Sequence, residues 1–259
     1  MAKKIKIYDL SQPLGVGIPI WPWAGGMNDF QQKRVSYFEN GPKTASEITL
    51  KMHYSTHQDA PYHVKCDALT IDQVPLESCY GEGVCLSVPT KKWEVITAAM
   101  LEEAASKVPG GVQEGDFVVI NTGWHKEFRK DNYAYMNHFG GMYREAGEWL
   151  YNKKVKGVAI DQGALDHPCA RPPLSKYMPW LDEEYKVATG KDPKNEFPEY
   201  EPCHHIFLEN GISGYENIGG EIDKVTGKRC IFAGFPIRWE KGDGSVVRFV
   251  AITEEDDDE

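Results

Sequence analysis

The stretch HYSTHQDAPYH, residues 53–63, gathers three histidines and one aspartate into eleven positions. Pro61 interrupts the stretch, so it does not form a regular helix. The side chains in it that can bind divalent metals or transfer protons are those of His53, His57, Asp59 and His63. The stretch therefore predicts an irregular segment that presents several metal ligands together.

The spacing of these residues predicts that the backbone curls. All four have odd numbers, so a strand would point them to one face. A straight strand separates positions 53 and 57 by roughly 13 Å. That is too far for two ligands that each lie about 2.0–2.2 Å from one metal. We expect turns at Ser55-Thr56 and at Ala60-Pro61, and we disfavour the alternative of a polar loop with unrelated surface histidines.

A second pair of candidate ligands lies in CHHIFLENGISGYEN, residues 203–217. His204 and Glu216 stand on either side of Asn210-Gly211, a dipeptide that ends a helix or turns a hairpin. This reversal can bring the two residues to one location. His205 would then point away from His204, which favours a packing or surface role. The same role is expected of the histidines without clustered partners, which are His125, His138 and His167.

Strand and helix patterns alternate along the rest of the chain. Apolar or alternating runs predict strands over residues 4–10, 46–54, 83–88, 116–124 and 155–161. Helical spacing predicts helices over 98–108 and 142–154, and two strands at 230–239 and 245–252 are expected to form a hairpin around EKGDG. The order indicates an α/β fold, with a single domain over residues 1–253 that has a mixed β-sheet core and flanking helices.

Two segments stand apart from this pattern. Residues 166–203 are rich in proline, charge and aromatic rings and only weakly periodic, which is typical of a lid, an interface or an inserted arm. Such a stretch does not easily pack as a regular element, and its rings are unfavourable to leave in water. These rings are Tyr177, Trp180, Tyr185, Phe197 and Tyr200. The terminal EEDDDE, residues 254–259, is expected to be a solvated acidic tail.

Composition narrows the class of protein. The 259 residues, 41% of them hydrophobic, are enough to bury a full core. A formal net charge of −10 argues against a nucleic-acid partner, which would need clustered Lys and Arg. No apolar run is long enough to span a membrane, and the start MAKKIKIYDL lacks the apolar core of a signal peptide. The six cysteines form no CxxC pair and are typical of reduced thiols. We therefore expect a cytoplasmic protein with no membrane partner.

The eleven-residue stretch closely resembles the HxGTHxDxPxH signature of the cyclase family of metal-dependent hydrolases, which includes bacterial kynurenine formamidase and isatin hydrolase. Ser55 stands where the family has glycine. Other segments are similar to family segments, namely IYDLSQPLGVGIPIWP (7–22), DFVVINTGW (116–124), VAIDQGALD (158–166) and HHIFLENGISGYEN (204–217). Gly163 and Ala164 replace the usual residues, and 166–203 looks like an insertion. The resemblance implies the swivelling β/β/α fold of kynurenine formamidase.

The resemblance also implies a hydrolytic metal site with one or two ions, Zn²⁺ or Mn²⁺, per subunit. Asp59 would belong to both metal sites and, with Glu216, bridge them, while His63 would be the general acid/base. By resemblance, the metal ligands are His53, His57, Asp59, His204 and Glu216. Trp21 aligns with a substrate-contacting tryptophan, and Trp21 and Trp23 offer apolar faces to an aromatic substrate. The alternative for both tryptophans is core or interface packing.

The function that follows is hydrolysis of a C–N bond in a small aromatic substrate, either a cyclic amide or a formamide. A divalent metal lowers the pKa of its bound water to about 7, and His63 can return a proton to the departing nitrogen. Two alternatives remain, a lactone hydrolase and a metal-assisted dehydratase or cyclase. A purely structural metal site is disfavoured because such sites are closed and usually rich in cysteine.

An assembly is expected as well. The resembling family forms dimers and tetramers whose subunits wall each other's pockets. We therefore expect a homodimer or homotetramer in which residues 166–203, together with the 13–27 loop, cover a neighbouring active site.

Overall fold

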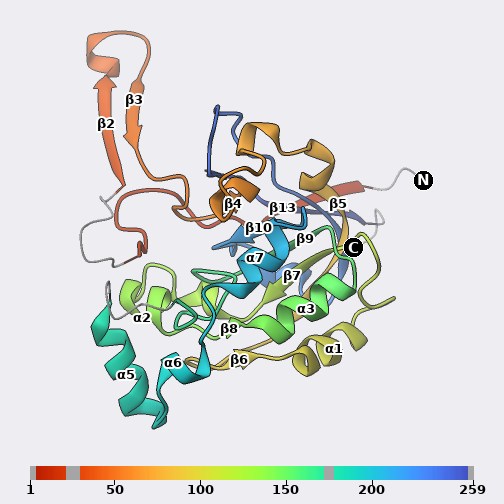
Figure 1. Cartoon of the computed structure of the whole chain (residues 1–259). Helices are drawn as coiled ribbons and strands as arrows, with labels where there is room; N and C mark the ends of the chain where they lie inside the picture. Colours follow the sequence, from red (N-terminus) through yellow and green to blue (C-terminus); the bar gives the residue numbers. More distant parts are fainter. Residues whose placement is uncertain (1–3, 22–29, 172–177, 256–259) are drawn as a thin grey trace.

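The structure is a computed structural model that describes residues 4–21, 30–171 and 178–255 (Figure 1). Its centre is a nine-stranded mixed sheet. From one edge to the other the strands are β1 (Lys4–Asp9), β13 (Val250–Glu255), β11 (Arg229–Ala233), β5 (Tyr80–Ser87), β7 (Phe117–Asn121), β9 (Gly157–Ile160), β10 (Ser213–Glu216), β4 (His57–Asp59) and β12 (Gly244–Val246). Trp23 and Tyr177 lie outside the described residues.

The central strands are parallel and buried on both faces. β5, β7, β9 and β10 pair in parallel, and every residue of β7 and β9 is buried. Side chains alternate between two cores, so Val118 and Ile120 lie in one core while Phe117 and Val119 lie in the other. Strands covered on both faces read as continuous apolar runs, which is why the sequence identified them.

One core lies beneath three helices, α1 (Ala98–Ser106), α3 (Arg144–Asn152) and α7 (Pro202–Leu208). The other core lies inside the curl of the sheet. The ring of Phe249, just before β13, lies 4.7 Å from Tyr215 of β10 and 6.5 Å from Phe117 of β7. The sheet therefore folds over its own central strands, and the predicted α/β fold with a mixed sheet and flanking helices is confirmed.

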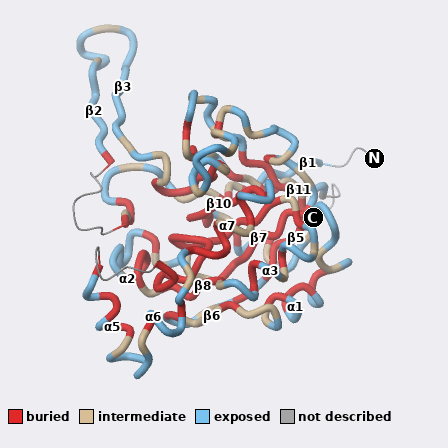
Figure 2. The backbone as a smooth tube through the Cα atoms, viewed as in Figure 1, coloured by how far each residue is buried: buried red, intermediate tan, exposed pale blue. Residues whose placement is uncertain are grey.

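A two-stranded hairpin, β2 (Gln31–Ser36) and β3 (Ala45–Thr49), extends away from the body (Figure 1). Nearly all of it is exposed (Figure 2). The predicted strand over 46–54 is thus wrong in its extent, because β3 ends before the histidine-rich stretch. A separate pair joins β6 (Val95–Ile96) to β8 (Gly141–Met142). Short 3-10 helices lie at Phe38–Asn40, Pro61–His63, Ile71–Gln73, Leu76–Cys79 and Trp124–Glu127.

The 166–203 segment is more regular than expected. It contains α5 (Pro179–Thr189) and α6 (Pro193–Glu196), and these lie beside α2 (Asn132–Asn137) at one end of the molecule (Figure 1). Tyr185 and Phe197 are buried against Trp93 of the same chain. The expectation that this stretch does not pack as a regular element is therefore wrong, since prolines stand in the first turns of both helices, where they are tolerated.

The C-terminal part also differs from the predicted hairpin. β11 does pair with β13, with Ile231 opposite Ile252. The chain between them opens out, however, and β12 pairs with β4 instead of extending the hairpin. β13 continues through Glu255 opposite Lys4 of β1, so the first two residues of the expected acidic tail belong to the sheet. The last helix, α8 (Ile222–Val225), follows β10. Within the described ranges, no helix combines the length and apolarity that a membrane crossing requires.

Candidate metal centre

The stretch 53–63 turns on both sides of β4, as its spacing predicts. Ser55 adopts a left-handed conformation with φ of 55°, a conformation that glycine adopts at lower cost. Its hydroxyl donates to the backbone oxygen of Gln12 at 3.1 Å, which holds the turn. After β4, the chain passes through Ala60 into the 3-10 helix Pro61–His63. Both predicted turns are therefore confirmed.

β4 brings the second pair of candidate ligands to the first. It pairs with β10 in the register that sets His57 opposite Glu216. His57 Nε2 lies 3.4 Å from Asp59 Oδ1 and 3.4 Å from Glu216 Oε2. His204 on α7 reaches the same point, with Nε2 3.0 Å from Glu216 Oε1 and 3.6 Å from Asp59 Oδ2. His53 Nδ1 lies 2.7 Å from Asp59 Oδ1.

The five residues form two groups that share one aspartate. His53, His57 and Asp59 offer one set of close ligand atoms, and Asp59, His204 and Glu216 offer the other. The structure therefore brings together all five residues that the sequence predicted as metal ligands. The helix that carries His204 ends before Asn210-Gly211, and β10 follows directly, so the predicted reversal is the end of a helix.

The residues present fit a divalent metal. Among the described residues, His57 Nε2 and both carboxylate oxygens of Asp59 are buried and make no hydrogen bond of acceptable geometry, although Asp59 Oδ1 lies 2.7 Å from His53 Nδ1. Buried polar atoms without partners are costly, and a buried carboxylate especially so. A cation between the two groups would satisfy all three atoms. Imidazole and carboxylate ligands without a thiol suit Zn²⁺ or Mn²⁺.

The outer nitrogens of two of these histidines are held by hydrogen bonds. His57 Nδ1 lies 2.8 Å from the backbone oxygen of Ser55, and His204 Nδ1 lies 2.7 Å from Asp166 Oδ2. A nitrogen that donates its proton outward leaves the other nitrogen free to bind a metal. Asp166 also accepts from the backbone N–H groups of Cys203 and His204, so it fixes the start of α7.

Asp243 does the same for the third histidine, His53, and no pattern in the sequence pointed to it. Its Oδ2 lies 3.1 Å from His53 Nε2. Asp243 belongs to the EKGDG segment, which pattern alone identifies only as a turn. Asp166 is the last residue of VAIDQGALD (158–166), a segment that begins within β9 and was noted for its family resemblance, although Asp166 itself was not predicted. Together these carboxylates orient the two histidines on the outside of the cluster.

Replacing Asp243 by asparagine should weaken metal binding about 10–100-fold, the usual effect of losing the partner that orients a metal-binding histidine. Asparagine keeps the size of the side chain but cannot accept the His53 proton as a carboxylate does. Titration against a chelating indicator measures the affinity. Glu240→Gln, in the same loop and exposed, is the matched control and should bind like the parent. Equal affinities for the two variants would contradict this role.

In the metal-free cluster, histidines and carboxylates hold each other in their charged forms. Burial lowers the pKa of His57, but the charge of Asp59 outweighs it and raises the pKa to about 10. Burial also opposes protonation of His53, whose interactions with Asp243 and Asp59 raise its pKa to about 9. Glu216 is buried and near another carboxylate, yet His204 brings its pKa down to about 2.

Metal binding should therefore depend strongly on pH. A histidine must lose its proton before its nitrogen can bind a metal, so affinity falls as pH falls. With pKa values of about 9 and 10 for His53 and His57, we expect affinity to rise between pH 6 and pH 9 by about tenfold per pH unit for each proton displaced. The stability of the metal-free fold should change with pH in the opposite direction. The raised pKa values of His53 and His57 stabilise that fold fully below about pH 6.5, and this stabilisation is lost as the pH rises through about 9–10. Metal titrations across this range test the prediction, and a flat affinity would contradict it.

His63 lies at the exposed side of the cluster. Its ring centroid is 4.2 Å from that of His53 and 6.1 Å from that of His204. Desolvation lowers the pKa of His63, and the nearby charge of Asp59 opposes this without reversing it. His63 is thus the neutral, accessible histidine beside a charged and buried cluster. It also forms a third close group with His53 and Asp243.

The remaining predicted residues are placed as follows. Trp21 is buried, with its ring 6.2 Å from that of Phe139. His205 is exposed and pairs with Glu209 at 2.6 Å, so its surface role is confirmed. His125 Nδ1 lies 2.7 Å from the buried Asp161, a satisfied position that agrees with the expected packing role.

Of the two other histidines, His138 contacts the 166–203 segment and His167 lies within it. His138 lies 2.7 Å from Glu184 of α5, and the buried His167 stacks on Phe197 at 4.1 Å. Packing therefore accounts for both side chains.

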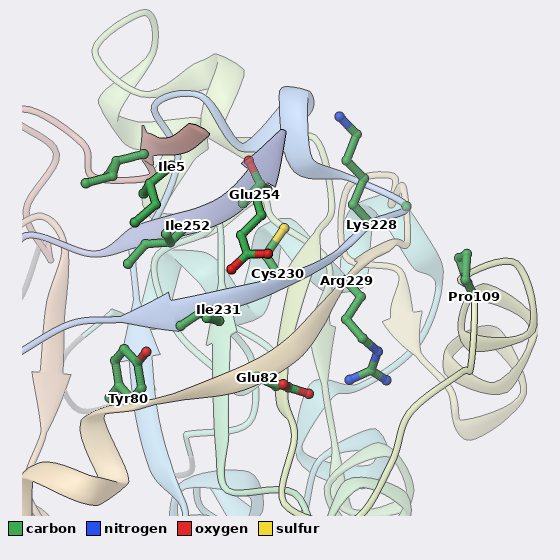
Figure 3. Close-up of a pocket in the computed structure, with 13 residues that line it drawn as sticks. Ile5, Tyr80, Glu82, Pro109, Lys228, Arg229, Cys230, Ile231, Ile252 and Glu254 are labelled. Atoms are coloured by element: carbon green, nitrogen blue, oxygen red, sulfur yellow. The ribbon is translucent and has the colours of Figure 1, made fainter. Parts of the chain in front are cut away.

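A hollow away from this cluster lies on the sheet. It has a volume of about 1170 Å³ and lies over β1, β13, β11 and β5 (Figure 3). Ile5, Ile231 and Ile252 line it together with Tyr80 and Arg229, and it contains no histidine. A smaller cavity of about 160 Å³ borders Asp59. We place the chemistry at the metal-ligating cluster because ligand atoms converge there, whereas the larger hollow is an open face of the sheet.

Comparison with known proteins shows which family the chain belongs to. A family model described as "Putative cyclase" matches residues 8–167. The chain is 27% identical over 161 residues to Cyclase-like protein 3 of Arabidopsis thaliana, which covers 60% of this chain and 57% of the plant protein. It is 26% identical over 190 residues to a kynurenine formamidase of Erythrobacter litoralis (strain HTCC2594), over 71% of this chain and 78% of that protein. The match thus spans less than two thirds of the plant relative.

Two solved structures share the fold. An isatin hydrolase bound to the product analogue thioisatinate superposes with a TM-score of 0.79 at 21% identity, over 97% of this chain and 93% of that one. Isatin hydrolase A from Ralstonia solanacearum gives the same TM-score and identity, over 96% and 92%. The fold expected from the sequence resemblance is confirmed by these superpositions.

Proposed function

The chain belongs to the cyclase family, and from that premise we propose that it is a metal-dependent hydrolase of a C–N bond in a small aromatic cyclic amide or formamide. The observation that carries the proposal is the pair of ligand groups sharing Asp59, with unpartnered buried atoms between them and the neutral His63 beside them. Relatives and similar structures named kynurenine formamidase and isatin hydrolase support a hydrolytic activity.

The five ligands would hold one or two ions, Zn²⁺ or Mn²⁺. Asp59 would contribute one oxygen to each group and Glu216 would join the second, while the histidines would bind through the nitrogens that face inward. When bound, the metal supplies a water of lowered pKa and polarises the substrate carbonyl. The buried position of these ligands excludes bulk water from the reacting atoms.

His63 would move the proton. A nitrogen leaving group departs poorly unless it is protonated, so amide hydrolysis needs an acid close to the cleaved bond. His63 lies beside His53 and His204 and is exposed toward solvent. Because its pKa is lowered, it is neutral at pH 7 and can first accept the proton of the attacking water. It can then donate that proton to the departing nitrogen.

The direct test is activity of the purified protein after loading with Zn²⁺ or Mn²⁺. We expect hydrolysis within a panel of aryl formamides and cyclic imides, and loss of that activity after dialysis against a chelator. Lactones in the same panel test the ester alternative. Activity on lactones alone, or equal activity with and without metal, would overturn the proposal.

We also propose that the chain works as a homodimer or homotetramer. Tyr185 and Phe197 are buried within the chain, so their rings no longer support an assembly. Trp180 and Tyr200, in contrast, remain exposed. The projecting β2–β3 hairpin adds apolar side chains that a neighbouring subunit could cover, and these are Val35, Tyr37, Phe38 and Ile48.

Light scattering should therefore give a mass that is two or four times that of the chain. The mass should fall when residues 31–49 are replaced by a short Gly/Ser linker. A monomeric full-length chain would contradict the assembly.

A further inference from the structure

A third group of possible metal ligands lies on the solvent side of the candidate metal centre. This outer group consists of His53, His63 and Asp243, whose ligand atoms all lie within 4.8 Å of one another. Of the two groups that share Asp59, only one has a member in common with the outer group, and that member is His53. The roles described above use these side chains singly and do not require that they converge.

The imidazole of His53 faces both ways. Its Nδ1 lies 2.7 Å from Asp59 Oδ1, toward the buried ligands, whereas its Nε2 lies 3.1 Å from Asp243 Oδ2, toward solvent. Because the two nitrogens of an imidazole are separate ligand atoms, one ring can contribute to an inner ion and to an outer ion. The outer nitrogen of His53 can therefore take part in a further site while the inner contact is kept.

The fold places the outer group before any ion arrives. The N–H of Ala60 donates to the backbone oxygen of Asp243 at 3.0 Å, which joins the loop before β12 to the 3-10 helix Pro61–His63. The next residue of that loop is Gly244, where a Cβ would lie only 2.7 Å from His53 Cε1. Glycine at this position therefore leaves the space in which the His53 ring lies.

The outer group is accessible, unlike the inner ligands. The side chain of Asp243 is 47% exposed and that of His53 is 19% exposed, whereas His57 and Asp59 are 2% and 1% exposed. His63 is an exposed residue as well. An ion from solution can therefore reach the outer group without any rearrangement of the buried cluster.

Two imidazoles and one carboxylate favour zinc at this position. Zn²⁺ binds such ligands at about 2.0–2.2 Å, so small rotations of the exposed side chains are enough to bring the three atoms onto one ion. Sites of this kind bind Zn²⁺ more tightly than Mn²⁺. Binding would displace the proton between His53 Nε2 and Asp243, which is released to solvent. We therefore expect the outer group to select Zn²⁺ over Mn²⁺.

We propose that His53, His63 and Asp243 form an inhibitory zinc site on the solvent side of the metal centre. The inhibition rests on the proposed function, in which His63 moves the proton. An ion on His63 occupies the nitrogen lone pair that would accept the proton of the attacking water. Excess Zn²⁺ thus switches off an enzyme that the ions of the two inner groups activate, and the same excess of Mn²⁺ leaves it active.

Counting bound ions tests the site without turnover. The parent protein is dialysed against increasing free Zn²⁺, and bound zinc is measured by elemental analysis. We expect one weakly bound ion in addition to those held by the groups that share Asp59. His63→Ala should lack only this ion and keep the tightly bound ones. The control is His205→Ala, which changes an exposed histidine paired only with Glu209 and should bind as much zinc as the parent.

Two results of this count would overturn the inference. Equal zinc in the parent and in His63→Ala would show that the outer group binds no ion. Loss of a tightly bound ion from His63→Ala would show that His63 belongs to the inner centre. Thermal unfolding checks that each variant is folded. Should His63→Ala not fold, His63→Gln also lacks the imidazole while filling more of its space, and the same zinc count is expected.

Inhibition is the second readout. Protein loaded with zinc and freed of the excess should lose about 10²-fold or more in rate when excess Zn²⁺ is added, as the loss of a general acid/base predicts. Dialysis should restore the rate, and excess Mn²⁺ should not change it. An additional ion that leaves the rate unchanged, or inhibition without an additional ion, would overturn the inference. An additional ion that depends on His63, in a protein that hydrolyses nothing in the panel, would support the outer site and overturn the proposed function.

Discussion

Replacing Asp59 by alanine should leave the protein with almost no bound metal. Asp59 belongs to both ligand groups, and its two oxygens face His53, His57 and His204. Its removal eliminates the only carboxylate shared by the two groups and leaves a single carboxylate ligand, Glu216. Elemental analysis of the purified variant measures the metal directly.

A second measurement guards against simple unfolding of this variant. A ligand that binds only the folded state raises the unfolding temperature, so added metal should stabilise the parent protein but not Asp59→Ala. Asp67→Ala is a suitable control, because Asp67 is exposed and close in sequence. Normal metal content in Asp59→Ala would show that the ligands have been assigned wrongly.

Replacing His63 by alanine should have the opposite pattern, with metal and fold retained and activity reduced about 10²–10⁴-fold, the range expected for a general acid/base. His63 contacts the cluster through His53, yet it contributes to neither of the two groups that contain Asp59. Steady-state kinetics on the best substrate from the panel, together with metal analysis, tests both parts of the prediction.

His205→Ala is the matched control for His63. That histidine is exposed on α7 and pairs only locally with Glu209, so its loss should not change the rate. If His63→Ala is purified without metal, His63 is a ligand, and the group formed by His53, His63 and Asp243 is the second site. The proton-transfer role would then pass to another residue, with His204 the nearest candidate.

Much of the metal centre could be predicted because it is encoded locally. Four of the relevant side chains stand within eleven residues, and the need to bring His53 and His57 to one ion required the turns that the structure shows at Ser55 and Ala60. The central strands were equally clear. β7 and β9 are buried on both faces, so their sequences are unbroken apolar runs.

The exceptions are positions where the partner is remote. The composition of the 166–203 segment indicated that the Tyr185 and Phe197 rings would be covered, but it did not indicate by what. A neighbouring subunit was equally compatible with it, whereas the structure packs both rings on Trp93 of their own chain. The run over residues 245–252 was expected to form one strand, but the structure divides it, with β12 paired to β4 and β13 paired to β11 and β1. Local pattern predicts that a strand forms and does not predict which strand it joins.

The sequence by itself therefore determined the ligand types, their approximate grouping and the parallel core of the sheet, because each depends on residues close together in the chain. Only the tertiary structure decided what surrounds the ligands. Asp243 reaches His53 across 190 positions of sequence separation, and Asp166 reaches His204 across 38. These contacts arise from the pairing of β4 with β10 and β12 and from the placement of α7, which long-range packing fixes. The same holds for Arg171 and Glu201, because no periodicity in the chain reveals that two charges thirty residues apart will be buried together.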